Sequence, residues 1–362
     1  MPVIRLLRAR LTAAGADRGA VALTVGLLLS TGVLLGMAAL VVDVGNLYVE
    51  RGQLQNGADG GALRIGQLCA TDPVGCSRSG TDLTVVAESY AERSANDDAA
   101  AATVCGRGGP LSACPAWQDR LTDCVGPPPE SVDYVEVQTS TRTGDGSTVL
   151  PPFFAQAVVG GYQGAEVGAC SRVAWGPPAT ANTLAMTISA CDWNRYTGNG
   201  AFPPDVRSFP VYNEDASTTC PPGSGSAGGG PGGFRFLKDA DDDCRTTSTI
   251  GDGRRANTGD SRPTSCRNKP LEDLVTAGRP ILVPVFGEIT GGGGNADYLV
   301  SGFAAFVITG WQLPGLDVPP TGGSLCDAGE SCVYGYFTEM VVPGGGAIGG
   351  PDLGARVVAP IG

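Results

Sequence analysis

The longest apolar stretch of the chain covers residues 19–42, which contain no charged side chain. Residues 1–18 carry four arginines, and Asp43, Glu50 and Arg51 follow the stretch. A helix of this length spans about 36 Å, more than the ~30 Å hydrocarbon core of a bilayer. Because basic residues stay on the cytoplasmic side, we predict a single transmembrane helix with its N-terminus in the cytoplasm. The competing interpretation is a cleaved signal peptide, whose apolar region is usually about 7 to 15 residues long.

An apolar stripe at helical spacing continues beyond this stretch and is interrupted once, by Arg51. Its members recur every three or four residues: Leu40, Val44, Leu47, Leu54, Ala58, Ala62, Ile65 and Leu68. Six glycines lie within 45–66, and each costs about 1 kcal/mol relative to alanine inside a helix. Burial of the stripe has to offset that cost, so we predict an amphipathic helix over 43–70 that docks on the domain outside the membrane.

Small residues recur along one face of the predicted span. Gly32 and Gly36 form a G-x-x-x-G pair, a spacing that lets two transmembrane helices approach closely. We therefore predict helix packing at Gly32 and Gly36, with a membrane partner or a helix-mediated oligomer. The alternative is that the spacing marks no partner, because small residues are frequent in any transmembrane helix.

The chain after the amphipathic helix begins with a compact α/β pattern. Residues 83–95 have helical periodicity, and Asp82 is the expected N-cap. Residues 133–141 and 167–175 alternate as strands. Between them, residues 151–159 have the pattern of a short helix opened by proline.

From residue 179 onward, glycine, proline and small polar residues dominate, and three β-rich segments stand out at 280–286, 298–312 and 333–342. The predicted class is α+β, with a transmembrane helix continuing into an amphipathic helix and then a disulfide-rich domain with long Gly/Pro-rich loops. The predicted divisions are a basic N-terminus (1–18), a transmembrane helix (19–42), an amphipathic helix (43–70), a small α/β region (71–178), a loop-rich β-containing domain (179–343) and a Gly/Pro-rich tail (344–362). Within the tail, residues 356–359 have the pattern of a strand.

Composition narrows the classes of function. A net charge of −12 argues against nucleic-acid binding, which needs a basic surface. The twelve cysteines contain no C-x-x-C pair, so we predict structural disulfides formed in an oxidising compartment. Twelve cysteines allow about ten thousand pairings, although the first two and the last two are close enough to close small loops. The candidates are Cys69, Cys76, Cys105, Cys114, Cys124, Cys170, Cys191, Cys220, Cys244, Cys266, Cys326 and Cys332.

The chain contains no histidine, which excludes Ser-His-Asp and Cys-His catalysis and histidine-ligated metal sites. Carboxylates such as Glu288 and Asp297 remain as a basis for hydrolysis. The acidic run at 239–243 lacks the glycine and the final glutamate of an EF-hand, so we interpret it as a solvated loop. We predict no catalytic residue, no cofactor and no metal site, and we expect the protein not to be an enzyme.

A combined motif surrounds the outer end of the apolar stretch. Arg18-Gly19 precedes the stretch, a D-x-G-x-x-Y follows at 43–48, and an R-x-x-L-Q-N-x-A-D follows at 51–59. This pattern resembles the TadE/TadG-like family of membrane-anchored proteins associated with the assembly of Flp (tight-adherence) pili. The family motif residues are Gly19, Asp43, Gly45, Tyr48, Arg51, Leu54, Gln55, Asn56 and Asp59.

Elementary physics gives some of these residues a role. Asp43 stands where the apolar stretch ends and charge is tolerated, and Tyr48 is placed as an aromatic interface anchor. Gln53 and Gln55 offer hydrogen bonds along the helix flank, either to the outer domain or to a neighbouring subunit.

The resemblance, the apolar stretch and the cysteines together imply a non-enzymatic component of Flp-type pilus assembly or associated secretion. We expect a single-pass protein of the cell membrane that acts through helix and surface contacts with other membrane or pilus-assembly proteins. A membrane-anchored extracellular binding protein or adhesin is the alternative. An anchored hydrolase using carboxylates is a third hypothesis.

Overall fold

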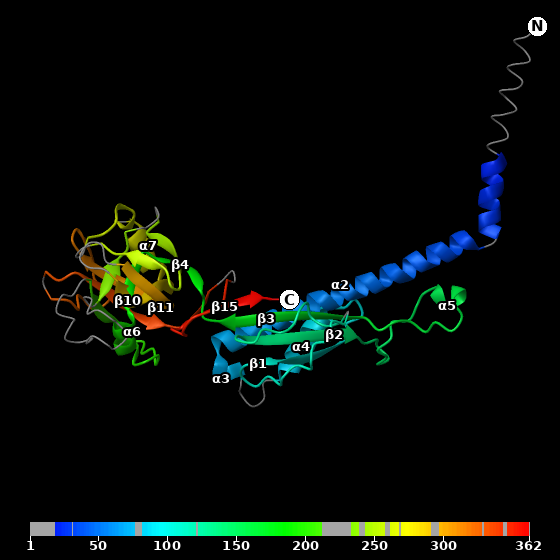
Figure 1. Ribbon diagram of the computed structural model, residues 1–362, viewed down its shortest axis with the longest axis horizontal. Coiled ribbons are helices and arrows are strands. Elements are labelled where there is room, and N and C mark those ends of the chain that lie inside the picture. Colours follow the sequence, from blue (N-terminus) through cyan, green and yellow to red (C-terminus); the bar gives the residue numbers. More distant parts are fainter. Residues whose placement is uncertain are drawn as a thin grey trace, which may run out of the picture.

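The computed structural model is elongated: a long N-terminal helix leads into two modules that lie end to end (Figure 1). The proximal module is formed by residues 43–176 and 340–361, and the distal module by residues 177–339. The structure describes residues 19–30, 32–76, 82–120, 122–211, 233–238, 243–257, 261–267, 269–290, 297–327, 329–342 and 346–361.

The apolar stretch forms two helical segments rather than one. Residues 19–30 are helical, and α2 (Val33–Thr71) begins after Gly32. Gly32 has a φ of 73°, a left-handed conformation that glycine adopts without a steric penalty. The prediction of one continuous helix over 19–42 is therefore wrong, because this turn interrupts the regular i→i−4 hydrogen bonding. Among the residues described, none of the helices combines the length and the apolar character needed to cross a membrane.

The proximal module packs α2 and α4 (Leu83–Ser94) on a five-stranded sheet (Figure 1). In spatial order its strands are β1 (Ala100–Arg107), β2 (Asp133–Thr141), β3 (Gly168–Gly176), β15 (Ala355–Pro360) and β14 (Met340–Val342). Neighbouring strands are antiparallel except for β14 and β15, which are parallel. Leu54, Ala58, Ala62 and Ile65 are buried in the core beneath this sheet, so this half of the predicted apolar stripe is the face by which α2 docks. Leu40 and Val44, which belong to the same predicted stripe, are exposed.

Two glycines of α2 bring that helix into close contact with α4. A Cβ atom at Gly57 would lie 2.6 Å from the Cα of Ala91, and one at Gly61 would lie 3.3 Å from the Cα of Ala87. The glycines that weaken the helix intrinsically are therefore the points where the two backbones meet.

The distal module is built on an eight-stranded sheet with the order β6-β13-β11-β10-β5-β7, to which β9 and β12 add by pairing with β11. The bounds are β5 (Met186–Ser189), β6 (Arg207–Pro210), β7 (Phe234–Phe236), β9 (Gly253–Arg255), β10 (Ile281–Thr290), β11 (Asp297–Leu313), β12 (Leu316–Val318) and β13 (Cys332–Thr338). A separate pair consists of β4 (Thr180–Leu184) and β8 (Arg245–Thr249). In the core, the rings of Phe209, Phe234, Phe306 and Phe337 lie 4.9 to 6.4 Å apart.

Short helices complete the two modules. They are α3 (Pro73–Cys76), α5 (Ala155–Val158), α6 (Ala190–Thr197), the 3₁₀ turn η2 (Thr264–Cys266) and α7 (Lys269–Ala277). Of these, α5 stands apart from both sheets and lies near the beginning of α2 (Figure 1).

The chain returns from the distal to the proximal module before it ends. β15 pairs with β3 from Val357 opposite Gly176 to Pro360 opposite Val173. Arg356 donates a hydrogen bond to the carbonyl oxygen of Ala70 at the end of α2, at 3.0 Å. The strand predicted at 356–359 is thus present as β15. The segment 344–362 is nevertheless not a peripheral tail, because β15 lies inside the first sheet, between β3 and β14.

The disulfide-rich character predicted from the sequence is confirmed. Cys191 is disulfide-bonded, and no cysteine in the described part of the chain is free. The described bridges are Cys69–Cys76, Cys105–Cys114, Cys124–Cys170, Cys244–Cys266 and Cys326–Cys332.

Candidate functional site

Asp43 connects the N-terminal helix with a distant loop. Its carboxylate, 7% exposed, accepts backbone hydrogen bonds from Phe153 (2.7 Å), Phe154 (3.1 Å) and Ala155. These amides open α5, whose own N-cap residue provides no side-chain hydrogen bond. A carboxylate is favourable there, because the first amides of a helix have no partner within it. Asp43 therefore caps α5 from 110 positions away in the sequence.

The loop that carries α5 connects β2 to β3 and is closed at its neck. Leu150 and Ala165 exchange two backbone hydrogen bonds, of 3.0 and 3.3 Å. Beyond the neck, Pro151 and Pro152 have no N–H group to satisfy. At the far end of α5, the amide of Val159 donates to the carbonyl oxygen of Ala155 at 2.7 Å. The neck, α5 and Asp43 together define the shape of the tip, which we call the aromatic tip (residues 149–165).

The aromatic tip presents large apolar side chains to the outside. Phe153 is 64% exposed and Phe154 is 51% exposed. An open groove of about 560 Å³ lies between the tip and the beginning of α2. None of the residues that line it has a polar side chain: Gly32, Gly36, Ala38, Ala39, Val42, Phe154 and Ala157. The two glycines predicted to pack against another helix are thus on the side of the helix that faces α5.

The other residues of the family motif divide between core and surface. Leu54 is buried, and Gln55 donates hydrogen bonds to the carbonyl oxygen of Cys170 (3.0 Å) and to Asp59 (2.9 Å). Gln53 accepts a hydrogen bond from the amide of Asn96 at 3.0 Å. Both glutamines therefore contact the chain's own proximal module. The remaining motif positions are exposed: Gly19, Gly45, Tyr48, Arg51, Asn56 and Asp59.

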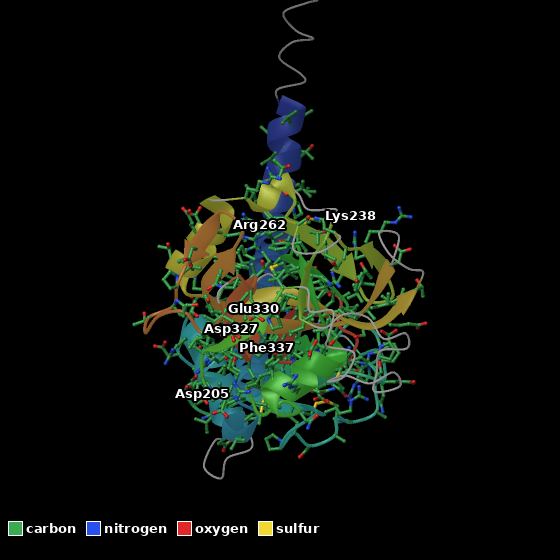
Figure 2. The ribbon with its side chains drawn as sticks, turned by 90° about the vertical axis from the view of Figure 1, so that its left-hand side faces the viewer. Asp205, Lys238, Arg262, Asp327, Glu330 and Phe337 are labelled. Atoms are coloured by element: carbon green, nitrogen blue, oxygen red, sulfur yellow. A yellow bond between two sulfur atoms is a disulfide. The ribbon has the colours of Figure 1, made fainter. Side chains whose placement is uncertain are left out.

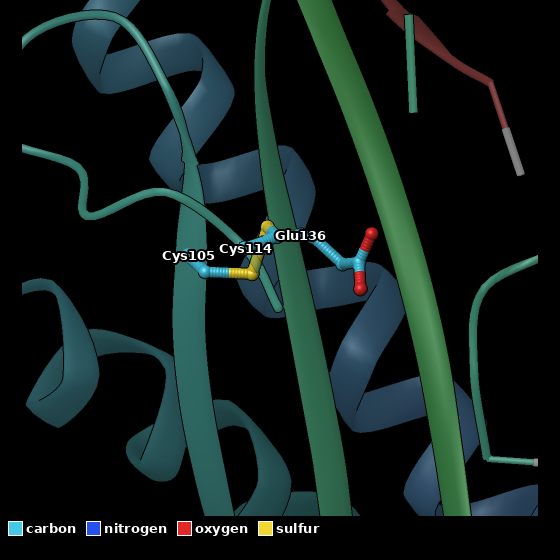
Figure 3. A group of neighbouring side chains, drawn as sticks. All are labelled: Cys105, Cys114 and Glu136. Atoms are coloured by element: carbon cyan, nitrogen blue, oxygen red, sulfur yellow. A yellow bond between two sulfur atoms is a disulfide. The ribbon is translucent and has the colours of Figure 1, made fainter. Parts of the chain in front are cut away.

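Three groups in the described part of the chain combine two cysteine sulfurs with one carboxylate within 4.8 Å. In every one of them the two cysteines form a disulfide, including the Cys105–Cys114 bridge beside Glu136 (Figure 3). Metals bind the thiolate form of cysteine, which a disulfide sulfur cannot provide. None of the three is therefore a metal-binding arrangement in the oxidised protein.

Glu136 instead belongs to a buried ion pair. Its carboxylate accepts hydrogen bonds from Arg172 on the neighbouring strand, the shorter one 2.7 Å long, and both side chains are almost fully buried. The same guanidinium donates to the carbonyl oxygens of Gly126 (3.2 Å) and Pro127 (3.3 Å). Because these contacts compensate the desolvation of both charges, the pair has a structural role in joining β2, β3 and the preceding loop.

Of the carboxylates considered for chemistry, Glu288 and Asp297 lie on neighbouring antiparallel strands, opposite Leu299 and Thr290 respectively. Asp239 to Asp242 lie outside the described residues. Glu288 is on β10 and Asp297 at the start of β11, where Asp297 forms an exposed ion pair with Arg255 at 3.4 Å.

The outer end of the distal module carries an exposed acidic loop. Figure 2 shows Asp327 and Glu330 on this end of the molecule. Their backbone carbonyl oxygens accept hydrogen bonds from the Gln312 side chain at 2.9 and 3.0 Å, and the Cys326–Cys332 bridge closes the loop. The loop is therefore well held, and its two carboxylates face solvent.

The fold is that of a disulfide-bonded α+β protein. Its two modules follow a long helix, α2, which begins within the apolar stretch. Residues 19–64 match the family model described as "Putative Flp pilus-assembly TadE/G-like". The resemblance inferred from the N-terminal motif is confirmed for this region, which includes Asp43 but not the loop that Asp43 caps. The searches of curated proteins and of solved structures gave no match to the chain.

Proposed function

We propose that this protein is a membrane-anchored, non-enzymatic component of Flp-type pilus assembly or of associated secretion. The observation that carries the proposal is the TadE/G-like match over residues 19–64, which covers the apolar stretch and much of α2. The protein acts through contacts with other membrane or pilus-assembly proteins rather than through a chemical reaction.

In this proposal, residues 19–42 anchor the chain in the cell membrane, with the N-terminus in the cytoplasm and both modules outside. Two observations support the anchoring. Large apolar side chains of this segment are exposed, among them Val21, Leu23 and Met37, and a surface of that kind is typical of a membrane or partner contact. The disulfides support an extracytoplasmic location, because such bonds persist in oxidising compartments.

Deleting the gene and counting Flp-type fibres by electron microscopy tests the function. We expect loss of fibres and their return in a strain that carries the full-length gene. Normal fibre numbers in the deletion strain would contradict the proposal. They would favour the second candidate, an anchored binding protein or adhesin, for which the exposed acidic end of the distal module would be the surface to probe.

We propose that Gly36, which lines the groove, is a contact point for a membrane protein partner. Gly36→Ile should reduce the recovery of a co-purified membrane partner, because the larger side chain prevents close helix approach. Met37→Ile, which changes the next residue from one large apolar side chain to another, is the matched control. Equal recovery with both variants would refute packing at Gly36.

A further inference from the structure

We propose that the aromatic tip is a second membrane contact, in which Phe153 and Phe154 insert into the outer interface of the bilayer beside the N-terminal segment. This proposal rests on the membrane anchoring of residues 19–42. It assigns a lipid partner to a loop that lies outside the region of family similarity, which ends at residue 64.

The charge pattern of the loop fits a lipid surface. Residues 149–165 contain no charged side chain, although the chain as a whole carries 60 charged residues, 24 basic and 36 acidic. The flanking charges, Asp145 and Glu166, lie at the base of the loop, on the side of the neck that leads to the sheet. An uncharged tip with aromatic side chains is typical of a segment at a membrane interface, where aromatic rings are favoured.

The position of the loop fits the same partner. Asp43 is the first charged residue after the apolar stretch, and it holds the start of α5 at that level. The groove beside α5 extends to Gly36, seven positions before Asp43, which corresponds to about 10 Å along a helix axis. The aromatic tip therefore runs alongside residues that the proposed anchoring places within the bilayer. Phe154 lines this groove together with Val42, and Phe153 is exposed next to Phe154 in the chain.

Several backbone amides around Phe153 and Phe154 have hydrogen-bond partners within the protein. Backbone groups immersed in lipid need partners within the protein. Asp43 satisfies the amides of residues 153–155, and the two preceding prolines have none. The amides of Ala157, Val159 and Tyr162 donate to carbonyl oxygens within the same loop. The buried charge of Asp43 is itself compensated by these hydrogen bonds, which permits a carboxylate at this depth.

Photocrosslinking of the full-length protein tests the proposal. A photoreactive amino acid replaces Phe153 in one variant, Leu23 in a second and Val74 in a third, and each protein is reconstituted into phosphatidylcholine/phosphatidylglycerol vesicles. Leu23 reports on the N-terminal anchor and is 72% exposed. Val74, equally exposed at 71%, lies in α3 beyond the other end of α2 and is the control for chance contact. Adducts are identified by mass spectrometry after irradiation.

We expect lipid adducts from positions 153 and 23 and no lipid adducts from position 74. Lipid adducts at position 23 together with protein adducts, or none, at position 153 would overturn the proposal while the anchoring stands. Protein adducts at 153 to a second copy of the chain would identify the tip as a protein interface. Absence of lipid adducts at position 23 would refute the anchoring, and with it the role of the tip.

Discussion

At the scale of single residues, Asp43 has the most consequential environment in the described structure. It is a buried carboxylate on α2 whose partners are three backbone amides of a loop that follows β2. The sequence predicted only that Asp43 stands at the membrane interface, and a carboxylate there does not require hydrogen bonds from a distant loop. The structure therefore adds a second role to this motif residue, namely the docking of the aromatic tip onto the helix.

Asp43→Ala should release the aromatic tip. Loss of a helix cap costs about 1 kcal/mol and up to about 2, and the amides of residues 153–155 lose their acceptor. We expect faster hydrogen exchange at these amides and faster chymotrypsin cleavage after Phe153 or Phe154, both measured by mass spectrometry. Asp59→Ala, which removes an exposed carboxylate from the same helix, should leave both rates unchanged. Unaltered exchange in the Asp43 variant would show that the loop is held by other contacts.

Glu50 provides a pH-dependent prediction. Partial burial raises the pKa of its carboxyl above the ordinary value, a hydrogen bond with Thr141 opposes the shift, and the negative charge of Asp97 adds to it. The fold thus favours the protonated form. Its stabilising contribution is complete below the unfolded-state pKa and is lost as the pH rises through the folded-state pKa.

Glu50→Gln mimics the protonated form and should therefore stabilise the protein at pH 7. The gain should be below about 1 kcal/mol, because the side chain is only partly buried, and it should vanish as the pH falls below the unfolded-state pKa. Urea unfolding at a series of pH values measures it, with Glu130→Gln at an exposed position as control. A variant that is less stable than the parent at pH 7 would contradict this sign.

At the scale of elements, the contact between α2 and α4 explains why a helix with many glycines is stable. Gly57 and Gly61 have almost no space for a side chain, whereas Gly45 and Gly52 have no neighbouring atom within 4 Å of an added Cβ. The same residue type thus serves packing at two positions and only lowers helix propensity at the other two.

This difference predicts opposite effects for two alanine substitutions in one helix. Gly52→Ala should stabilise the protein by about 0.5 to 1 kcal/mol, because alanine is the better helix former. Gly57→Ala should destabilise it by about 1 to 3 kcal/mol, the range for overpacking, because the new Cβ meets the backbone of Ala91. Thermal unfolding of both variants measures the effects. If both substitutions stabilised the protein, α4 would have to move away from α2 to make room for the new Cβ at position 57.

At the scale of the whole molecule, the C-terminal strand makes the two modules interdependent. The chain leaves the first sheet after β3, forms the distal module and returns with β14 and β15. Ala355 and Val357 are fully buried or nearly so, and Arg356 reaches the end of α2. The distal module is therefore an insertion between two strands of the proximal sheet.

Removing the returning strand should expose an edge of β3. In a chain that ends at residue 350, the backbone of residues 173–176 loses its partners on β15 while the pairing with β2 remains, and the amides that face β15 should exchange faster in hydrogen-exchange mass spectrometry. A chain that lacks only residue 362 is the control, because the amide of Ile361 donates to the carbonyl oxygen of Arg172 on β3. Val358→Asp in the full chain tests the same pairing if the shorter chain fails to fold. Unchanged protection of β3 would show that β15 is dispensable.

Patterns among residues that are close in the sequence were enough to predict several elements of this structure. The repeat of Leu54, Ala58, Ala62 and Ile65 identified the buried face of α2, because residues three or four apart share one side of a helix. Asp82 caps α4, accepting hydrogen bonds from the amides of residues 84 and 85, as predicted from its place before an apolar helix. The α+β class, the strand over 133–141 and the two shortest disulfide loops follow from patterns within a few residues.

Tertiary structure alone decided the long-range contacts. The sequence marks Asp43 as the end of an apolar segment, but its partners lie 110 positions away, and no local spacing encodes them. The same holds for the bridge between Cys124 and Cys170, for the approach of Gly57 to Ala91, and for the place of β15 beside β3. The physical reason is that periodicity and capping depend on neighbours along the chain. Strand order and loop docking depend instead on which distant surfaces meet after the chain has folded.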